Sequence, residues 1–245
     1  MKISFVIPAY NEERIVAACI DSIKAEAART SADVEIVVVN NASTDGTRRA
    51  AEDAGARVVD EPRKGLTRAR QTGLEHTQGD LVANVDADVI ILPGWLDTVF
   101  SQFASNSELV ALSGPHIYHD LSLFERLLVR LFYAAGLAIT LLQRIILGRG
   151  AMLQGGNFVV RRSALEKIGG FDTTIEFYGE DTNIAIRLSR VGRVKWTFRL
   201  PVYASGRRLK HEGVLHTGLR YAANFFSVSL SGKPITTEHA DIRPL

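Results

Sequence analysis

The sequence predicts an α/β protein in which helices flank a mostly parallel β-sheet. In the first part of the chain, apolar runs of strand length alternate with amphipathic stretches of helix length, separated by short joints rich in Pro, Gly, Asn and Asp. The composition (245 residues, 46% hydrophobic and 23% charged) is typical of a folded globular chain. Because no repeat, low-complexity stretch or clear linker interrupts the pattern, we expect a single domain.

Strands and helices alternate in the first part. Residues 3–7 form a continuous apolar run that ends at Pro8, as in a buried strand, and residues 12–28 carry apolar side chains at four-residue spacing, as in a helix. Residues 34–39 form a second buried strand, followed by small polar residues that favour a turn and a helix cap. The next expected elements are a strand at 56–59, a helix at 67–77 and a strand at 81–85.

The pattern changes after a further expected strand at residues 109–114. Residues 121–147 form a long apolar segment that a few charges interrupt, and strand-like character returns at 155–160. The last expected elements are helices at 162–168 and 181–191, a strand at 194–198 and a helix from about 214 to 230. We therefore place the domain at residues 1–230, including an amphipathic helical insertion at 121–149, and a C-terminal tail at 231–245.

Polar residues follow three of the expected strands. In parallel sheets, ligands bind beyond the carboxyl ends of the strands, so Tyr10, Asn41 and Asp86 are expected to converge on one crevice. Asp86 and Asp88 place two carboxylates one residue apart at such a strand end, and carboxylate oxygens are preferred ligands of Mg²⁺ and Mn²⁺. An Asp-x-Asp pair is also common at solvated strand ends. Taken alone, the pair therefore does not distinguish a metal site from a solvated turn.

Four motifs occur in a fixed order along the chain. They are Val6-Ile7-Pro8-Ala9-Tyr10-Asn11-Glu12-Glu13, then Asn40-Asn41-Ala42-Ser43-Thr44-Asp45, then Asp86-Ala87-Asp88, then Gly169-Gly170-Phe171-Asp172 followed by Gly179-Glu180-Asp181. Together they resemble family 2 of the nucleotide-sugar-dependent glycosyltransferases, which have the GT-A fold. The resemblance covers roughly residues 2–192 and implies a Rossmann-like, mostly parallel sheet flanked by helices in a single domain.

The resemblance implies a binding site for a nucleotide-diphospho-sugar donor. Tyr10 matches the position near the base, Glu12 the position near the ribose, and Asn41 a position where many relatives carry a base-recognising aspartate. Asp88 is expected to coordinate Mn²⁺ or Mg²⁺, and Asp86 to face the ribose or a water on that metal. The implied donor-binding residues are Pro8, Ala9, Tyr10, Glu12, Asn41, Gly65, Arg70, Asp86, Ala87 and Asp88, and the implied metal ligands are Asp88 and Asp86.

The resemblance also implies an acceptor side. Asp181 is expected to be the general base that takes the proton of the acceptor hydroxyl, and in-line attack with one base predicts inversion at the anomeric carbon. The alternative is that Glu180 and Asp181 only suit the positive N-terminus of a helix. Gly156, Asn157 and Glu180 are expected on the acceptor side, and Arg207 and Arg208 on a mobile loop that closes over the diphosphate.

The apolar segment at 121–147 leaves open whether the protein is attached to a membrane. It is amphipathic, with Arg126, Arg130 and Arg144 on its polar face, so it suits a membrane-surface helix or a helix buried in the core or a dimer contact better than a membrane span. The formal net charge of +2 gives no indication of nucleic-acid binding. Because the N-terminal residues lack the features of a signal peptide, we expect a cytoplasmic protein, with peripheral attachment at the inner face of the cell membrane as an open alternative.

The sequence therefore predicts an inverting, metal-dependent glycosyltransferase that uses a sugar or lipid-linked acceptor, such as a cell-envelope glycan. One alternative is a sugar nucleotidyltransferase, although residues 8–11 lack the Gly-rich triphosphate loop expected after its first strand. A second alternative is a non-catalytic nucleotide-sugar-binding or scaffold protein with the same fold. The chain also lacks the Gln-x-x-Arg-Trp segment of processive relatives, so we expect a single transfer per encounter.

Overall fold

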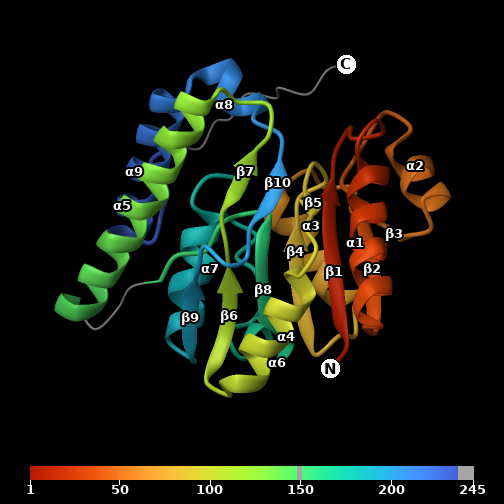
Figure 1. The fold of residues 1–245 in the computed structure, drawn as a ribbon, viewed down its shortest axis with the longest axis horizontal. Coiled ribbons are helices and arrows are strands. Elements are labelled where there is room, and N and C mark those ends of the chain that lie inside the picture. Colours follow the sequence, from red (N-terminus) through yellow and green to blue (C-terminus); the bar gives the residue numbers. More distant parts are fainter. Residues whose placement is uncertain (148–150, 237–245) are drawn as a thin grey trace.

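A seven-stranded sheet forms the centre of the molecule in the computed structural model, which describes residues 1–147 and 151–236 (Figure 1). The strand order is β3-β2-β1-β4-β8-β6-β9. All neighbours pair in parallel except β8, which runs antiparallel to both β4 and β6. The strands are β1 (Ile3–Ala9), β2 (Val34–Asn40), β3 (Arg57–Asp60), β4 (Leu81–Val85), β6 (Leu109–Ser113), β8 (Asn157–Arg161) and β9 (Arg193–Trp196).

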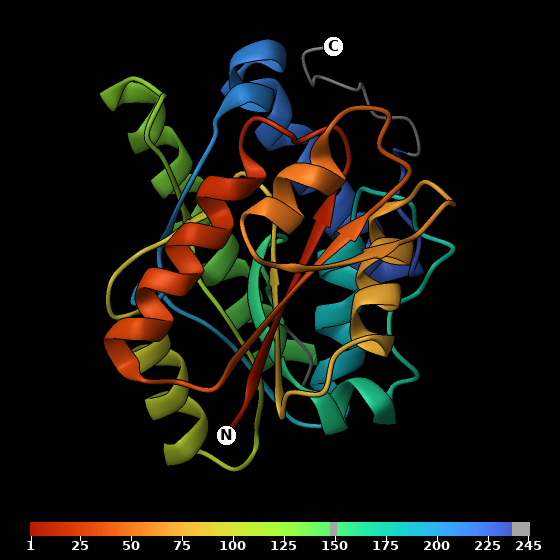
Figure 2. The same ribbon diagram turned by 90° about the vertical axis from the view of Figure 1, so that its right-hand side faces the viewer.

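Helices cover both faces of this sheet, as Figure 2 shows for α1 on one side and α3 and α7 on the other. Alternate side chains of β1 enter opposite layers, because successive side chains of a strand point to opposite faces. Phe5 packs in the layer that contains Trp95 of α4, whereas Val6 packs in the layer that contains Leu188 of α7. The flanking helices are α1 (Val16–Thr30), α2 (Thr47–Asp53), α3 (Leu66–Glu75), α4 (Trp95–Ser105), α6 (Arg162–Lys167) and α7 (Glu180–Ser189).

A second assembly lies beyond the carboxyl ends of the central strands. A small sheet of order β5-β10-β7 connects the main sheet to three further helices (Figure 1). A separate apolar cluster that includes Tyr133, Trp196 and Leu209 packs these helices against the body of the protein. The elements are β5 (Ile90–Ile91), β7 (His116–Tyr118), β10 (Val202–Ala204), α5 (Leu123–Leu147), α8 (Arg207–Glu212) and α9 (Val214–Ser231).

The α/β class and the flanked, mostly parallel sheet are confirmed, with four local differences. Helix α1 begins at Val16 rather than at residue 12, because Asn11 adopts a left-handed backbone (φ 53°) and the Glu12 amide donates to Thr47. Strand β8 is antiparallel, which its apolar pattern did not reveal. Helix α4 and the small sheet were not expected, and the basic segment expected as a mobile loop includes helix α8. Residues 148–150 of the proposed insertion and 237–245 of the proposed tail lie outside the described residues.

Candidate functional site

Three parallel strands deliver polar residues to the same edge of the sheet. Strand β1 pairs in register with β2, so that Ala9 lies beside Asn40, and the Asn41 amide donates to the Ala9 carbonyl at 2.8 Å. Strand β4 pairs with the other side of β1 and leads directly into Asp86. In Figure 1 these carboxyl ends point up, towards α8. The expected convergence of the residues that follow these strands is therefore present.

The Asn41 side chain holds the loop at residues 61–65. Its side-chain nitrogen donates to the carbonyls of Glu61 (3.0 Å) and Arg63 (2.8 Å), and its side-chain oxygen accepts from the Gly65 amide (2.9 Å). An aspartate could not donate to the two carbonyls, which explains in physical terms why an amide suits this position. Gly65 has a φ of 150°, a backbone conformation that favours glycine. Asn41 thus fixes the loop that carries Gly65, while its contact with a base stays a prediction.

Tyr10 and Glu12 lie beside this loop. The Lys64 ammonium sits 3.7 Å from the centre of the Tyr10 ring, and a cation over an aromatic face is attracted by the ring quadrupole. The Glu12 carboxylate is 5% exposed, yet it accepts two hydrogen bonds from Arg207, at 2.5 and 3.0 Å. Pro8 and Ala9 are the last residues of β1 and shape this turn through their backbone. The end of β1 thus presents an aromatic ring beside Lys64 and a carboxylate paired with Arg207.

Asp86 and Asp88 occupy different surroundings at the end of β4. The Asp86 side chain is 37% exposed, whereas that of Asp88 is 18% exposed and lies 3.5 Å from Arg207. Burial, followed by the neighbouring Asp86, raises the pKa of Asp88 to about 7, and Arg207 opposes this shift. A side chain at Gly156 (φ 76°) would place its Cβ 2.2 Å from Asp86 Oδ2, so glycine is required beside this carboxylate. Ala87 between the aspartates is buried.

The two aspartates suit a hard divalent cation. Mg²⁺ and similar ions are commonly held by one or two carboxylates together with substrate phosphates, rather than by a cage of protein ligands alone. Among residues 1–147 and 151–236, no group of three or more His, Cys, Asp and Glu side chains could hold a metal by itself. Asp86 and Asp88 therefore fit a site that substrate oxygens complete, and Arg207 places a positive charge beside Asp88 in this structure.

The residues expected on the acceptor side include the N-terminus of α7. Glu180 and Asp181 are the first two residues of this helix, and Gly179 before them adopts a left-handed backbone (φ 77°). The Asp181 carboxylate accepts from the Thr182 amide at 2.7 Å. Burial raises the pKa of Asp181, which keeps its proton affinity above that of a solvated aspartate. A carboxylate of this kind is suited to accept a proton from a hydroxyl group.

A buried arginine links the end of β4 to the start of α7. Arg70 of α3 is fully buried; its Nη2 donates to Asp86 Oδ1 at 3.2 Å, and its Nη1 forms an ion pair with Glu180. The guanidinium carbon lies 5.2 Å from the centre of the Phe158 ring. Arg70 therefore contacts carboxylates on both sides of the crevice, although sequence reasoning placed it near the base or phosphates. This link carries no local sequence signal, because Glu180 lies far along the chain from α3.

Two of the expected site residues, Asn157 and Arg208, contact other residues of the protein in this structure. The Asn157 side chain is fully buried, accepts from Trp95 at 3.2 Å and donates to the carbonyls of Gly114 (3.1 Å) and Leu200 (2.8 Å). It therefore joins β8 to the segments that lead into β7 and β10. Arg208 donates to Glu212 at 2.9 Å and packs over Phe177, whereas Arg207 faces Glu12 and Asp88. The two arginines of α8 thus lie in separate environments.

The ionisation of Glu180 yields a prediction for pH dependence. Burial is the largest cause that raises its pKa from 4.5 to about 7, and Arg70 opposes this shift. Because the folded protein holds this proton more tightly than the unfolded chain, the contribution of Glu180 to stability is complete below about pH 4.5 and is lost as the pH rises through 7. We expect the melting temperature of Glu180→Gln, relative to wild type, to rise by roughly 5 °C between pH 5 and pH 8.

Differential scanning fluorimetry at both pH values measures this change. Glu176→Gln is the matched control, since Glu176 is exposed in the same segment, and its melting temperature should follow the wild type at both pH values. An equal pH dependence in wild type and Glu180→Gln would contradict the assignment of a raised pKa to Glu180.

The chain belongs to glycosyl transferase family 2, whose family model matches residues 4–169. Among curated proteins, it is 29% identical over 124 residues to glycosyltransferase GlyA of Streptococcus pneumoniae, a match that covers 49% of this chain and 17% of that protein. It is 27% identical over 195 residues to the UDP-forming cellulose synthase 1 catalytic subunit of Komagataeibacter xylinus, covering 71% of this chain and 24% of that protein. The chain thus spans about a quarter or less of the length of these relatives.

Solved structures show the same fold. The mannosyltransferase PcManGT from Pyrobaculum calidifontis, in complex with GDP-Man and Mn²⁺, has a TM-score of 0.71 and 22% identity, with 95% of this chain and 65% of that chain covered. Glucosyl-3-phosphoglycerate synthase from Mycobacterium tuberculosis, in complex with Mn²⁺, UDP and phosphoglyceric acid, has a TM-score of 0.63 and 22% identity, with 96% and 80% covered. The expected GT-A fold and the membership of family 2 are confirmed.

Proposed function

We propose that this protein transfers a sugar from a nucleotide-diphospho-sugar to an acceptor hydroxyl, with inversion at the anomeric carbon. The observation that carries the proposal is that Arg70 joins two groups of carboxylates, one at the ends of β1 and β4 and one at the start of α7. Glu12 and Asp88 contact Arg207 on one side, and Glu180, next to Asp181, contacts Arg70 on the other. Separate sites for a charged leaving group and an attacking hydroxyl are what such a displacement requires. Membership of family 2 supports the same reaction class.

On the donor side, Tyr10 stacks against the base and Glu12 binds the ribose hydroxyls. Asp88, with Asp86, holds Mn²⁺ or Mg²⁺, which when bound neutralises charge on the departing nucleoside diphosphate. Arg207 exchanges its carboxylate partners for diphosphate oxygens, because guanidinium groups bind phosphate through paired hydrogen bonds. These roles are consistent with the positions of Tyr10 and Glu12 after β1, of Asp86 and Asp88 after β4, and of Arg207 at the start of α8.

On the acceptor side, Asp181 takes the proton of the attacking hydroxyl as the new glycosidic bond forms. Burial raises the pKa of Asp181 and so increases its affinity for the proton of the hydroxyl group. Glu180 is turned towards Arg70 rather than towards this proton. Attack from the Asp181 side, opposite the leaving group, inverts the anomeric carbon.

A thermal-shift panel of nucleotide sugars, each with and without Mn²⁺, tests the donor class. A ligand that binds the native state raises its melting temperature, so one nucleotide sugar at about 100 times its Kd should add roughly 2.7 kcal/mol of stability in the presence of Mn²⁺. The corresponding free sugar is the control. If no nucleotide or nucleotide sugar shifts the melting temperature under either condition, the proposal is wrong.

We further propose that α5 and α9 bring the enzyme to the inner face of the cell membrane, where the acceptor is a lipid-linked or cell-envelope glycan. Helix α5 exposes large apolar side chains in successive turns, including Leu123 (83% exposed), Leu127 (52%) and Leu131 (57%). Helix α9 packs closely beside it, as a Cβ at Gly218 would lie 2.5 Å from the Phe132 ring. None of the described helices is long and apolar enough to cross a membrane.

The positive charges beside the exposed apolar side chains favour a lipid bilayer as the partner of this surface. Beside these apolar side chains, α5 carries the partly exposed Arg126 and the exposed Arg130, with Glu125 as its acidic residue. Apolar side chains bordered by positive charge complement a bilayer that contains anionic headgroups. The same charges would repel each other across an interface between two copies of this surface.

Vesicle flotation measures this association. We expect the protein to float with vesicles of phosphatidylglycerol and phosphatidylcholine, to bind pure phosphatidylcholine at least about tenfold more weakly, and to be released from both by Leu127→Glu with Leu131→Glu. Ile235→Glu is the control, because Ile235 is exposed (70%) outside both helices. Equal binding of the double variant and the wild type would exclude α5 as the contact, and a concentration-dependent dimer without lipid binding would assign the surface to a second copy.

A further inference from the structure

Arg70 is a charged residue without access to solvent. It lies in the middle of α3 (Leu66–Glu75) and has no exposed surface. Burying an unpaired guanidinium in a protein interior is strongly unfavourable, so its position must be explained by its partners. Here, those partners are two carboxylates and an aromatic ring.

The two carboxylates come from opposite sides of the crevice. Asp86 follows β4 on the donor side, and its Oδ1 is 3.2 Å from Arg70 Nη2. Glu180 begins α7 on the acceptor side and pairs with Arg70 Nη1. The planar guanidinium therefore offers one terminal nitrogen to each carboxylate. The contact with Asp86 is a hydrogen bond and the contact with Glu180 is an ion pair, and a lysine ammonium has no second nitrogen with which to reach both carboxylates.

Glu180 depends on this contact more than Asp86 does. Its side chain is 6% exposed, whereas that of Asp86 is 37% exposed and can be solvated. Asp181, the proposed base, is the next residue of the same helical turn. The orientation of the first turn of α7 is thus tied through Arg70 to the end of β4, where the donor binds.

We propose that Arg70 is a positioning residue that aligns the proposed base Asp181 with the donor, by holding Glu180 and Asp86 at the two ends of one guanidinium. The inference rests on the proposed function. A nucleotide-binding role, by contrast, would require the guanidinium to be open to the crevice, and a purely structural ion pair would affect stability without affecting the chemical step.

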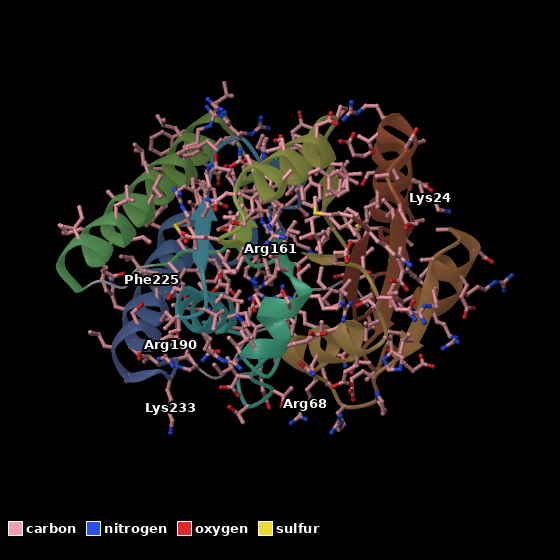
Figure 3. The ribbon with its side chains drawn as sticks, turned by 90° about the horizontal axis from the view of Figure 1, so that it is seen from below. Lys24, Arg68, Arg161, Arg190, Phe225 and Lys233 are labelled. Atoms are coloured by element: carbon pink, nitrogen blue, oxygen red, sulfur yellow. The ribbon has the colours of Figure 1, made fainter. Side chains whose placement is uncertain are left out.

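Arg70→Met and Arg70→Lys separate these roles. The methionine variant keeps much of the side-chain volume but removes both contacts, and the lysine variant keeps the charge with one point of contact. Arg68→Met is the matched control, because Arg68 lies on the same helix, is partly exposed, and is found at the edge of the molecule in Figure 3. Circular dichroism establishes that each variant is folded, and the kcat, the donor KM and the donor Kd are measured for each.

We expect Arg70→Met to lower kcat by about 100-fold, as a misplaced catalytic group does, while the donor Kd stays within about threefold of wild type. Arg70→Lys should recover about tenfold of this loss, and Arg68→Met should match the wild type. If Arg70→Met does not fold, Arg70→Lys alone decides, since it should lower kcat at unchanged Kd.

A wild-type kcat in either Arg70 variant would overturn the inference. So would a loss confined to the donor Kd and KM, because that result would identify a nucleotide-binding residue. If the wild type transfers no sugar from any nucleotide sugar, the proposed function itself is wrong, and this result is distinct from the other two because it is obtained before any variant is made.

Discussion

Asp181→Asn is expected to lower kcat by about 10²–10⁴-fold, the usual contribution of a general base, while the donor Kd stays close to that of wild type. An amide keeps the shape of the side chain and can still accept from the Thr182 amide, but it cannot take a proton from the acceptor hydroxyl. Steady-state transfer and calorimetric titration of the donor measure the two quantities.

Asp53→Asn serves as the control for this substitution. The Asp53 side chain is 72% exposed on α2, and its kcat and Kd should equal those of wild type. Retention of more than about a tenth of the wild-type kcat by Asp181→Asn would show that another group is the base. Glu180, the neighbouring carboxylate, would then be the next residue to replace.

Asp88→Ala is expected to abolish metal-dependent transfer without unfolding the protein. The carboxylate is mostly buried, and burial together with the neighbouring Asp86 raises its pKa to about 7. The charged form of Asp88 is therefore disfavoured by its surroundings and does not stabilise the fold. Its removal should leave the melting temperature of the metal-free protein equal to that of wild type or roughly 2–8 °C higher. Transfer should fall by at least about 10³-fold, because charge on the leaving diphosphate is no longer neutralised.

Asp97→Ala is the control for Asp88→Ala, since Asp97 is 61% exposed on α4, outside the crevice. Excess chelator added to the wild-type protein should reproduce the loss of transfer, and Mn²⁺ should restore transfer in the wild type but not in Asp88→Ala. Unchanged transfer in Asp88→Ala would refute the assignment of the metal site to this couplet. A melting temperature far below that of wild type would instead identify Asp88 as a structural residue.

Much of the fold follows from local patterns in the sequence. The strands β1, β2 and β4 are continuous apolar runs, and their direction follows from the helices between them, which explains why Tyr10, Asn41 and Asp86 could be placed at one edge. Strand β8 has the same kind of apolar pattern but runs antiparallel, and no local residue preference encodes that direction. Helix α4 was overlooked, although Pro93 and Gly94 mark a turn directly before it.

The links inside the candidate site could not be predicted, because they join distant parts of the chain. Arg207 and Glu12 are 195 residues apart, yet they form two hydrogen bonds. The role of Asn41 also depends on carbonyl groups of the loop at 61–65, whose position only the folded chain defines. The motifs identified which residues are chemically suitable, whereas the three-dimensional contacts show which carboxylates share a cation.

The stereochemistry of transfer tests the central proposal most directly. Proton NMR can follow the anomeric signal of the product formed from the donor that binds, with Mn²⁺ and with excess chelator. We predict a product of inverted anomeric configuration that forms only with the metal and is not detected for Asp181→Asn. A product of retained configuration, or equal rates of transfer in chelator, would contradict an in-line displacement assisted by Asp181 and a metal held at Asp88.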